Sequence, residues 1–582
     1  MIKRQQLDRH GRSLVLGRTL LFFAAIFAIA AGYDQHSMIL YTLAAALLLL
    51  FLCLLQLHSR LRQQLLLLQG HMAVLNDYMA RLQGQWHQFP DTGAAFLRED
   101  QPQAVDLSLL GPDSFYQYMT VARTQAGRQR LAAALQAAPP DFSALRQRQQ
   151  AVAELMERSH LSIDLQGISR LLPDGQDTGP LLDNLQKNTG MNSRFFLGCI
   201  RLVPLLTGMS LICAAAGWCS WMPGGLLVLL QLTLTLSMVS RHNTGLKPLQ
   251  HLSRELAVYE QLFLRLEQTD FHSGRLKKLT TRLQQGKGAA YALHKLARIS
   301  DFAEMRYNFF FFLLANALLL WDFHCQALFR DWQARAAKDL PRWLDIWSEI
   351  ELLMSLAVIG QTRENCCFPT LLDDASPQLQ AKNLQHLLLD EDKNIPNDIT
   401  AHNETRIITG SNMSGKTTFL RTVASSAVLA WAGAPVCAAS FQLTRLHVFT
   451  SIRVTDDITK GLSTFYAELL RIKSMVEFAK KKTPMLICID EIFKGTNSAD
   501  RIIGARAAIE RLTSGQNITL VSTHDFELCD LLSPNDTPIT NYHFAEDYDA
   551  AGRIHFDFRL QPGRCQTTNA KYLLRLTGIL EE

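Results

Sequence analysis

The run Gly410-Ser411-Asn412-Met413-Ser414-Gly415-Lys416-Thr417-Thr418 constrains this chain most, because it fits the pattern G-x-x-x-x-G-K-[ST]. Residues 406–409 before it predict a buried strand, and residues 419–424 after it predict the start of a helix. Backbone N–H groups in such a loop converge on phosphate, and the helix dipole adds partial positive charge. We therefore expect a cradle for the phosphates of ATP, with Lys416 reaching the β- and γ-phosphates and the Thr417 hydroxyl binding Mg²⁺.

A second apolar run, residues 485–489, predicts a buried strand that ends in Asp490 and Glu491. Open α/β sheets bind ligands at the carboxyl ends of their strands, where these two acids would lie. In phosphoryl-transfer sites the first acid holds Mg²⁺, and a second can orient and deprotonate the attacking water. We expect Asp490 to take the metal role and Glu491 to take the role of the base.

A third predicted strand, residues 518–523, ends in His524. A single histidine is often only structural. At a strand end beside a nucleotide, however, its ring can sense the γ-phosphate by hydrogen bonding, and we favour that role.

The sequence pattern changes at about residue 397, where short β-branched runs begin to alternate with runs of helical periodicity. This alternation predicts a doubly wound, mostly parallel α/β sheet of the P-loop ATPase kind at the C-terminal end. The preceding segments are long, periodic and poor in Pro and Gly, and they predict an all-α core or lever region. At 582 residues the chain is long enough for three or four domains.

The apolar content of 48%, with only 19% charged residues, suggests membrane segments. Residues 19–32 and 38–57 predict a first transmembrane hairpin, and residues 202–222 and 226–239 predict a second. The short loops inside the hairpins contain no Lys or Arg, whereas basic residues flank them: Arg60, Arg62, Lys187, Arg194, Arg241 and Lys247. The positive-inside rule then predicts a multi-pass protein of the cytoplasmic membrane, with both termini and the ATPase domain in the cytoplasm.

A further apolar run, residues 309–321, is too short to span a bilayer, and we expect it to be a buried core helix. The predicted domain order is 1–58, the cytoplasmic N-terminus and first hairpin; 59–190, a helical segment; 191–241, the second hairpin; 242–385, a helical core or lever segment; and 386–582, the ATPase domain. The 11 cysteines include no C-x-x-C pair, so neither a zinc site nor a disulfide framework is indicated.

Four segments together resemble the MutS family of mismatch-repair ATPases. The first is T-G-S-N-M-S-G-K-T-T-F-L-R-T around the phosphate loop, and the second is Asp490 to Asn497, where Phe493-Lys494 stands in place of the family's usual Gly-Arg. The third is Ser522-Thr523-His524, and the fourth is Asp456-Asp457-Ile458 followed by Gly461 to Phe465. The resemblance covers about 105–190 and 242–582, and it is most specific over 406–530.

The resemblance implies a homodimer with ATP and Mg²⁺ at the subunit interface. It also implies that Ser463 reaches across the dimer to the γ-phosphate of the partner subunit. No stretch before residue 105 resembles the family's mismatch-reading module, and no DNA clamp is evident within the helical core. Two hypotheses for the output follow. One is a membrane-anchored MutS-like ATPase coupled to mismatched or branched DNA. The other is an ATP-driven membrane switch that acts on a protein or lipid partner without binding DNA.

Overall fold

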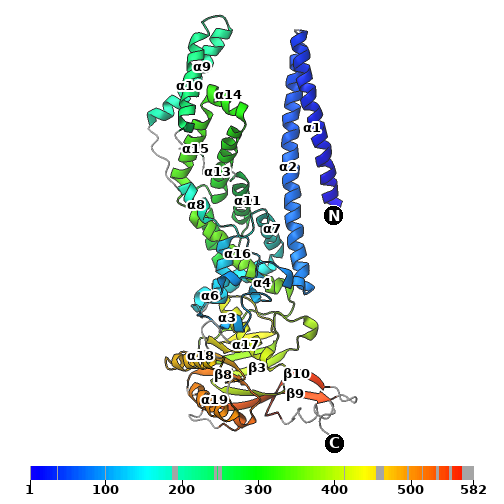
Figure 1. The fold of residues 1–582 in the computed structure, drawn as a ribbon, viewed down its shortest axis with the longest axis vertical. Coiled ribbons are helices and arrows are strands. Elements are labelled where there is room, and N and C mark those ends of the chain that lie inside the picture. The colour runs from blue at the N-terminus through cyan, green and yellow to red at the C-terminus, as the bar shows by residue number, and fades with distance from the viewer. Residues whose placement is uncertain are drawn as a thin grey trace. The chain divides into compact units, whose positions relative to one another are not determined.

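The computed structural model describes residues 2–35, 37–98, 100–186, 194–240, 246, 249, 252–411, 413–453, 464–494, 497–513, 515–531, 537–548 and 554–565 (Figure 1). The chain divides into two compact units. The first consists of Met1–Met79, His160–Asp270 and Thr280–Trp343, and the second of Ala80–Ser159, Phe271–Leu279 and Leu344–Glu582. Each unit is thus assembled from segments that lie far apart in the sequence.

The described part of the first unit is helical, as the sequence predicts for the region before the sheet. Its helices are α1 (Ile2–Asp34), α2 (Met38–Leu82), α7 (Ser159–Ser169), α8 (Gly179–Gln186), α9 (Arg194–Ala215), α10 (Met222–Ser240), α11 (Ser253–Gln268), α13 (Ala289–Glu304), the short η4 (Met305–Tyr307), α14 (Phe309–Leu319) and α15 (Trp321–Ala336). Helix α12 (Gly274–Leu283) straddles the boundary between the units.

Helices α1 and α2 form a hairpin whose apolar side chains are largely exposed, among them Phe27 and Leu49. The stretches Leu14–Asp34 and Met38–Leu82 are long and apolar enough to cross a membrane. Helix α2 continues without a break through residue 58, the predicted end of the first hairpin. The apolar N-terminal half of α2 therefore continues, as one helix, into a C-terminal half that packs on other helices.

The far end of α2 crosses α7 at very short range, because both helices have a glycine at the crossing. A Cβ added to Gly70 would lie 2.3 Å from the Gly167 carbonyl oxygen. Beside this crossing, His71 Nε2 lies 2.9 Å from Asp164 Oδ1, and Gln166 Nε2 donates to the Tyr78 hydroxyl at 3.1 Å. These contacts fix α2 to the helical bundle below its apolar half.

Helices α9 and α10 form the second apolar pair. Their described stretches Ile200–Ala215 and Met222–Ser237 are shorter than the two candidate spans of α1 and α2. Inside the pair, the fully buried Gln231 donates through Nε2 to Thr207 Oγ1. A polar side chain in an apolar environment needs such a partner, so this bond helps to hold the two helices together.

The expectation that residues 309–321 form a buried core helix is wrong. Helix α14 does form there, but Phe309 and Phe310 are 68% and 80% exposed, and Leu314 is 65% exposed. Only its small central residues are buried, and it packs against α10 and α9. Helix α14 alone is too short to cross a bilayer, but α14 and α15 together, bent by 81°, are long and apolar enough to count as a broken span or a re-entrant segment. Length did not decide between a protein core and another apolar environment.

The second unit begins with helices that lead into its sheets. They are η1 (Gln85–Gln88), η2 (Ala94–Phe96), α3 (Gln103–Asp106), α4 (Phe115–Met119), α5 (Gln125–Leu135), α6 (Phe142–Glu157) and the long buried α16 (Leu340–Thr362). Helix α5 starts at Thr124, whose hydroxyl accepts a hydrogen bond from the Gly127 amide, as an N-cap does. The buried Glu351 of α16 accepts from the amides of Arg123 and Thr124, and so joins α16 to the start of α5.

The C-terminal part contains two sheets, which matches the prediction of an α/β region. A four-stranded sheet has the order β1-β5-β2-β3, from β1 (Thr370–Leu371), β2 (Gln378–Leu384), β3 (Asn397–His402) and β5 (Ser440–Leu443). A six-stranded sheet has the order β10-β9-β4-β8-β7-β6, from β4 (Thr405–Thr409), β6 (His447–Ser451), β7 (Met485–Asp490), β8 (Asn517–Ser522), β9 (Ile539–Tyr548) and β10 (Ile554–Pro562). Neighbouring strands of this sheet are parallel to each other, except that β9 and β10 form an antiparallel pair.

Helices α17 (Lys416–Ala432), α18 (Thr464–Ala479) and α19 (Ser498–Thr513) pack against the six-stranded sheet (Figure 1). Met485, Ile487 and Ile489 alternate along β7 and join a core with residues of α18 and α19. Strands β4, β7 and β8 are buried along their whole length, and each has Ile, Leu or Val at its centre, as strands covered on both faces require. This register brings the carboxyl ends of β4, β7 and β8 to one edge, where the candidate site lies.

Candidate nucleotide-binding site

The phosphate loop connects β4 to α17 and needs unusual backbone angles. Gly410 has a φ of 150° and Gly415 a φ of 104°, both in the region that favours glycine. A Cβ on Gly410 would lie 2.8 Å from Ser414 Oγ and 3.1 Å from the Phe544 carbonyl oxygen, so a larger residue does not fit. Asn412, which belongs to the predicted cradle, lies outside the described residues.

Lys416 is the first residue of α17, and its side chain folds back over the loop. Its ammonium group donates to the carbonyl oxygens of Gly410 and Ser411, each at 2.7 Å. Burial lowers the pKa of Lys416, while the nearby carboxylates of Glu491 and Asp490 act in the opposite direction. A buried cation at the start of a helix is well placed to meet an anion.

Two loop hydroxyls strengthen this assignment. Ser411 Oγ and Ser414 Oγ are buried, and neither has a hydrogen-bond partner among the residues that the structure describes. Buried polar atoms are normally paired, so two such hydroxyls beside Lys416 fit a loop that completes its hydrogen bonds on a ligand. The residues present therefore fit a phosphate group.

Thr417 and Asp490 lie in contact, as the predicted Mg²⁺ site requires. Thr417 Oγ1 donates to Asp490 Oδ2 at 3.0 Å, while Ser522 Oγ donates to Asp490 Oδ1. Asp490 and Ser522 are register partners on β7 and β8, which explains the second bond. A hydroxyl and a carboxylate fit Mg²⁺, because that ion is usually held by one or two carboxylates together with substrate phosphates.

Glu491 and His524 also meet. His524 Nε2 lies 2.8 Å from Glu491 Oε1, and Lys494 Nζ lies 3.2 Å from Glu491 Oε2. These partners, His524 first, lower the pKa of Glu491 to about 2. The carboxylate is thus strongly held in its ionised form. Glu491 itself has a φ of 52°, in the left-handed region, where non-glycine residues are uncommon and often functional.

The chain after Glu491 is held by α18. The amide of Phe493 donates to the buried Glu468 Oε1 at 2.6 Å, and the rings of Phe493 and Phe465 meet edge to face with centroids 5.8 Å apart. Phe493 has a φ of 60°, at the position where the MutS-like pattern has glycine. These contacts connect the Glu491 loop to the start of the helix that follows residue 463.

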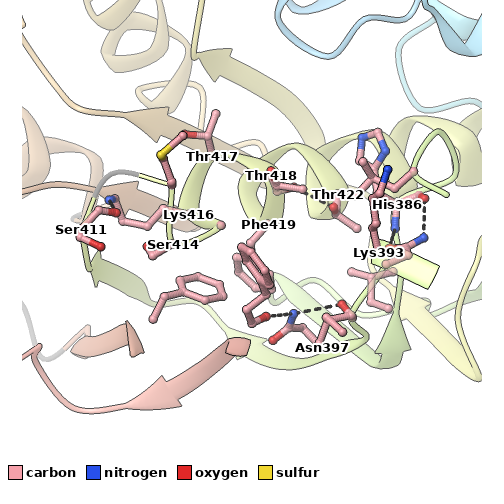
Figure 2. Close-up of a pocket in the computed structure, with 18 of the residues that line it drawn as sticks. His386, Lys393, Asn397, Ser411, Ser414, Lys416, Thr417, Thr418, Phe419 and Thr422 are labelled. Carbon is pink, nitrogen blue, oxygen red and sulfur yellow. Dashed lines mark hydrogen bonds between the residues drawn. The ribbon is translucent and has the colours of Figure 1, made fainter. Parts of the chain in front are cut away.

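A cavity of about 240 Å³ extends from the phosphate loop toward the four-stranded sheet (Figure 2). Lys416, Thr417 and Glu491 line one part, and His386, Lys393 and Asn397 line another. Phe419, Phe544 and Phe558 also line the cavity, together with aliphatic side chains. Apolar and aromatic walls with a few polar groups are what a planar nucleoside base requires.

Two details define the second part of the cavity. Burial, aided by Arg421, lowers the pKa of His386 to about 4, so its ring is neutral at physiological pH and offers an uncharged aromatic surface. The side-chain Nδ2 of Asn397 donates to the Phe558 carbonyl at 2.9 Å (Figure 2). Asn397 Oδ1 accepts from the Leu560 amide at 2.7 Å. Asn397 thereby ties β10 to the cavity wall.

The structure thus brings together Lys416, Thr417, Asp490, Glu491 and His524. Ser463, the residue expected to act across a dimer, lies outside the described residues, as do Asp456 and Asp457. Strand β6 precedes the segment that contains Asp456, Asp457 and Ser463. The end of β6 and the two residues that follow Ser451 are hydrogen-bonded to the fully buried Asp106 of α3. Asp106 accepts hydrogen bonds from Thr450 Oγ1, from the amides of Ile452 and Arg453, and from Arg471 Nη1.

Sequence reasoning missed three sets of residues in and around this site. Lys494 was noted as a departure from the MutS-like pattern, but its contact with Glu491 was not predicted. Ser522 belongs to one of the MutS-like segments, but the sequence indicates no role for it, although its position opposite Asp490 follows once β7 and β8 are neighbours. The cavity residues His386, Lys393 and Asn397 lie upstream of every motif, and only the polar cluster from residue 390 to 398 hinted at a loop there.

Comparison with known proteins identifies the C-terminal region. Residues 406–579 match the model of MutS domain V. The DNA mismatch repair protein MutS of Natronomonas pharaonis is 31% identical over 241 residues, which cover 40% of this chain and 27% of that protein. The Roseiflexus sp. protein of the same name is 37% identical over 194 residues, covering 32% and 17%. That of Thermus aquaticus is 31% identical over 252 residues, covering 43% and 29%.

The matched segments thus span less than a third of the length of these relatives. The match to MutS domain V includes the phosphate loop, Asp490, Glu491 and His524, which the structure gathers at one edge of the sheet. The C-terminal region of this chain is therefore MutS-like, and its similarity to MutS domain V supports membership of the MutS family.

Proposed function

We propose that this protein is a MutS-like ATPase that binds ATP with Mg²⁺ in the cavity beside Lys416 and hydrolyses it. One observation supports this most strongly: Lys416, the Thr417–Asp490 pair and the Glu491–His524 pair lie at the same edge of one sheet. Each member of this group has a role in phosphoryl transfer, where catalysis consists mainly of positioning and electrostatic stabilisation.

The roles follow from the contacts. Lys416 and the loop from Gly410 to Thr418 bind the phosphates. Thr417 and Asp490 hold Mg²⁺, and the ion when bound neutralises charge on the phosphoryl oxygens. Glu491 orients the attacking water and accepts its proton. His524 is hydrogen-bonded to Glu491 and orients that carboxylate. His524 also senses the γ-phosphate by hydrogen bonding, so the presence of the γ-phosphate affects Glu491.

The basicity of Glu491 sets a condition on this mechanism. With His524 and Lys494 bound, the pKa of about 2 makes the carboxylate a weak base. General-base catalysis is most efficient when the pKa of the base lies near the working pH. We therefore propose that Glu491 becomes an effective base only after one of these two partners turns toward the phosphates.

The subunit arrangement and the membrane anchorage belong to the same proposal. Two copies bind nucleotide at their shared interface, and Ser463 of each completes the site of the other. Helices α1 and α2 anchor the protein, supported by the two candidate spans, and α9 and α10 form a second hairpin. The protein is then a multi-pass protein of the cytoplasmic membrane, with its ATPase domain and both termini in the cytoplasm.

Two outputs of the ATPase are proposed. The relatives are named DNA mismatch repair proteins, which favours coupling to mismatched or branched DNA. The candidate membrane spans favour the alternative, an ATP-driven conformational switch that acts on a protein or lipid partner without DNA. Both outputs use the same ATPase, so they differ only in what stimulates turnover.

The experiment that separates them measures ATP hydrolysis by the detergent-purified protein with homoduplex, mismatched and branched DNA over a range of salt concentrations. Binding through phosphate contacts weakens steeply with salt, so a DNA-coupled enzyme should show salt-dependent binding and stimulated turnover. Turnover that is present but unchanged by all three DNAs supports the membrane switch. Absence of both nucleotide binding and turnover overturns the ATPase proposal itself.

Membrane fractionation of cells that express the protein tests the anchorage. Recovery of the protein in the soluble fraction overturns the membrane anchorage.

A further inference from the structure

Helix α14 has an apolar surface that the protein does not cover. Phe309, Phe310, Leu313 and Leu314 are all exposed, and the helix contains no charged residue. Burying a large apolar side chain is favourable relative to leaving it exposed to water. Four such side chains on two successive turns form a contiguous patch, and patches of this kind mark interaction surfaces.

The packing of α14 indicates which environment covers this patch. Its buried residues are the small Ala315, Asn316 and Ala317, and the helix packs against α10 and α9. Small residues at helix contacts are typical of packing between membrane helices. Helix α9 also exposes large apolar side chains, including Met209 and Ile212. The exposed patch of α14 thus belongs to the same apolar assembly as the second hairpin.

Residues at both ends of α14 are suited to the border between lipid and water. Before the helix stand Arg306 and the half-exposed Tyr307, and after it stand Trp321 and Asp322. Arg306 Nη2 lies 3.3 Å from Asp322 Oδ2, and Trp321 Nε1 donates to the Phe302 carbonyl at 2.9 Å. Aromatic and basic residues are enriched at membrane interfaces, and these contacts hold the entry and the exit of the segment together.

The geometry of the exit also agrees with a segment that turns back. Leu320 adopts a left-handed conformation with a φ of 50°, and the axes of α14 and α15 differ by 81°. Asn316 Oδ1 accepts a hydrogen bond from the Asp322 amide at 2.9 Å, so a polar group freed at the bend is paired. A helix of 11 residues is about 16 Å long, roughly half the thickness of a hydrocarbon layer.

We infer that α14 inserts its phenylalanine- and leucine-bearing face into the acyl chains of one membrane leaflet, beside α9 and α10. This inference rests on the membrane anchorage proposed above and adds a third contact with the bilayer. It has a structural consequence, because α14 connects α13 to α15, which pack on each other. The lipid contact is then made by the helical bundle itself and not only by the two hairpins.

The test places the photoreactive residue benzoylphenylalanine at single positions of the full-length protein, reconstituted in vesicles of phosphatidylethanolamine and phosphatidylglycerol. The test position is Phe310, the most exposed of the four. Phe27, in the candidate span of α1, is the positive control for lipid contact. Tyr291, an exposed residue of α13 near Lys287, is the aqueous control. After illumination, mass spectrometry measures the yield of phospholipid adduct at each position.

The inference expects an adduct yield at Phe310 close to that at Phe27 and far above that at Tyr291. Adduct at Phe27 but not at Phe310 overturns the inference and leaves the membrane anchorage standing. Absence of adduct at both positions overturns the anchorage and the inference together. A covalent protein dimer formed through position 310, in place of a lipid adduct, shows that a second copy covers α14 and also overturns the inference.

Discussion

His524 and Glu491 are hydrogen-bonded to each other, with Nε2 and Oε1 2.8 Å apart, although each was expected to face the nucleotide separately. They come from the ends of the neighbouring parallel strands β8 and β7. The Glu491 amide also donates to the Ser522 carbonyl at 3.0 Å, which fixes the two strand ends relative to each other. The proposed sensor and the proposed base therefore form one unit, so a change in one alters the other.

The first prediction concerns Glu491→Gln. This substitution keeps the size of the side chain but removes its ability to accept a proton. We expect ATP turnover to fall by about 10²- to 10⁴-fold, the usual contribution of a general base, with ATP binding retained. Turnover and equilibrium binding of a fluorescent ATP analogue are measured on the same preparation.

Glu510→Gln is the matched control for this prediction, because Glu510 is an exposed residue of α19 that pairs with Arg506. It should leave turnover unchanged. Near-normal turnover in Glu491→Gln would exclude Glu491 as the base. A loss of ATP binding together with turnover would assign it a structural role.

The second prediction concerns pH and His524→Ala. The hydrogen bond from His524 is the largest cause of the low pKa of Glu491, so its removal should raise that pKa from about 2 toward the ordinary value near 4.5. In the unmodified protein Glu491 stays ionised throughout the working range, so its protonation should not change the rate between pH 6 and pH 5. In His524→Ala, the rate should begin to fall below about pH 5, where Glu491 starts to take up a proton.

The lowered pKa of Glu491 also predicts how the stability of the fold depends on pH. Because the folded pKa of Glu491 lies below its unfolded value, the interactions that its carboxylate makes, the hydrogen bond with His524 first, stabilise the fold above about pH 4.5, and this stabilisation disappears as the pH falls through about 2. His524→Ala should therefore lower the melting temperature at pH 7 more than at pH 3. Identical pH profiles for the two proteins, in rate and in melting temperature, would contradict the coupling of His524 to Glu491.

The third prediction concerns Lys416→Met. Methionine has nearly the same length and tolerates burial, so the fold should persist while the positive charge in the phosphate loop is lost. Hydrogen bonds to charged groups are worth about 1.5–3 kcal/mol, which corresponds to roughly 10- to 100-fold weaker ATP binding. Lys480→Met, at an exposed position, is the control and should bind ATP normally. Unchanged affinity in Lys416→Met would mean that the ammonium group serves only the loop carbonyls of Gly410 and Ser411.

The contacts within the site that the sequence predicted are those that follow from local geometry. A glycine-bounded loop between a strand and a helix places Lys416 and Thr417 almost without reference to the rest of the protein. Asp490 follows because the carboxyl ends of parallel strands meet at one edge, so its contact with Thr417 needed only the order of neighbouring strands. The contact between Lys494 and Glu491 depends on the path of the chain after β7, for which no spacing rule exists.

Burial was harder to predict than helix formation. The apolar runs that became α2 and α14 have similar compositions, and both form helices as their sequences suggest. Length separates the long runs of α1 and α2 from the short run of α14, but only packing shows that α14 presents Phe310 outward and its alanines inward. Likewise, His386 and the phosphate loop line the same cavity because of the tertiary fold, and no sequence motif predicts this.

The fourth prediction concerns Asp106, whose importance comes entirely from tertiary structure. This fully buried carboxylate accepts hydrogen bonds from four donor atoms, in residues that precede or follow the segment containing Ser463. Asp106→Asn keeps the shape but replaces one acceptor oxygen by an N–H donor, which would then face other donors. It also leaves Arg471, a partly buried cation, without its counter-charge. Breaking a buried ion pair typically costs about 3–5 kcal/mol, and for this unit we expect a melting temperature roughly 5–10 °C lower.

Asp100→Asn is the control for Asp106→Asn, because Asp100 pairs with Arg98 on the surface, where ion pairs are worth about 0–1 kcal/mol. Its melting temperature should be nearly unchanged. If Asp106 also positions the segment after Arg453, ATP turnover measured well below the melting temperature should fall more than ATP binding, because the phosphate loop lies on a different strand. Equal effects of the two substitutions on melting would contradict the buried role of Asp106. Equal losses of binding and turnover would confine that role to the stability of the unit.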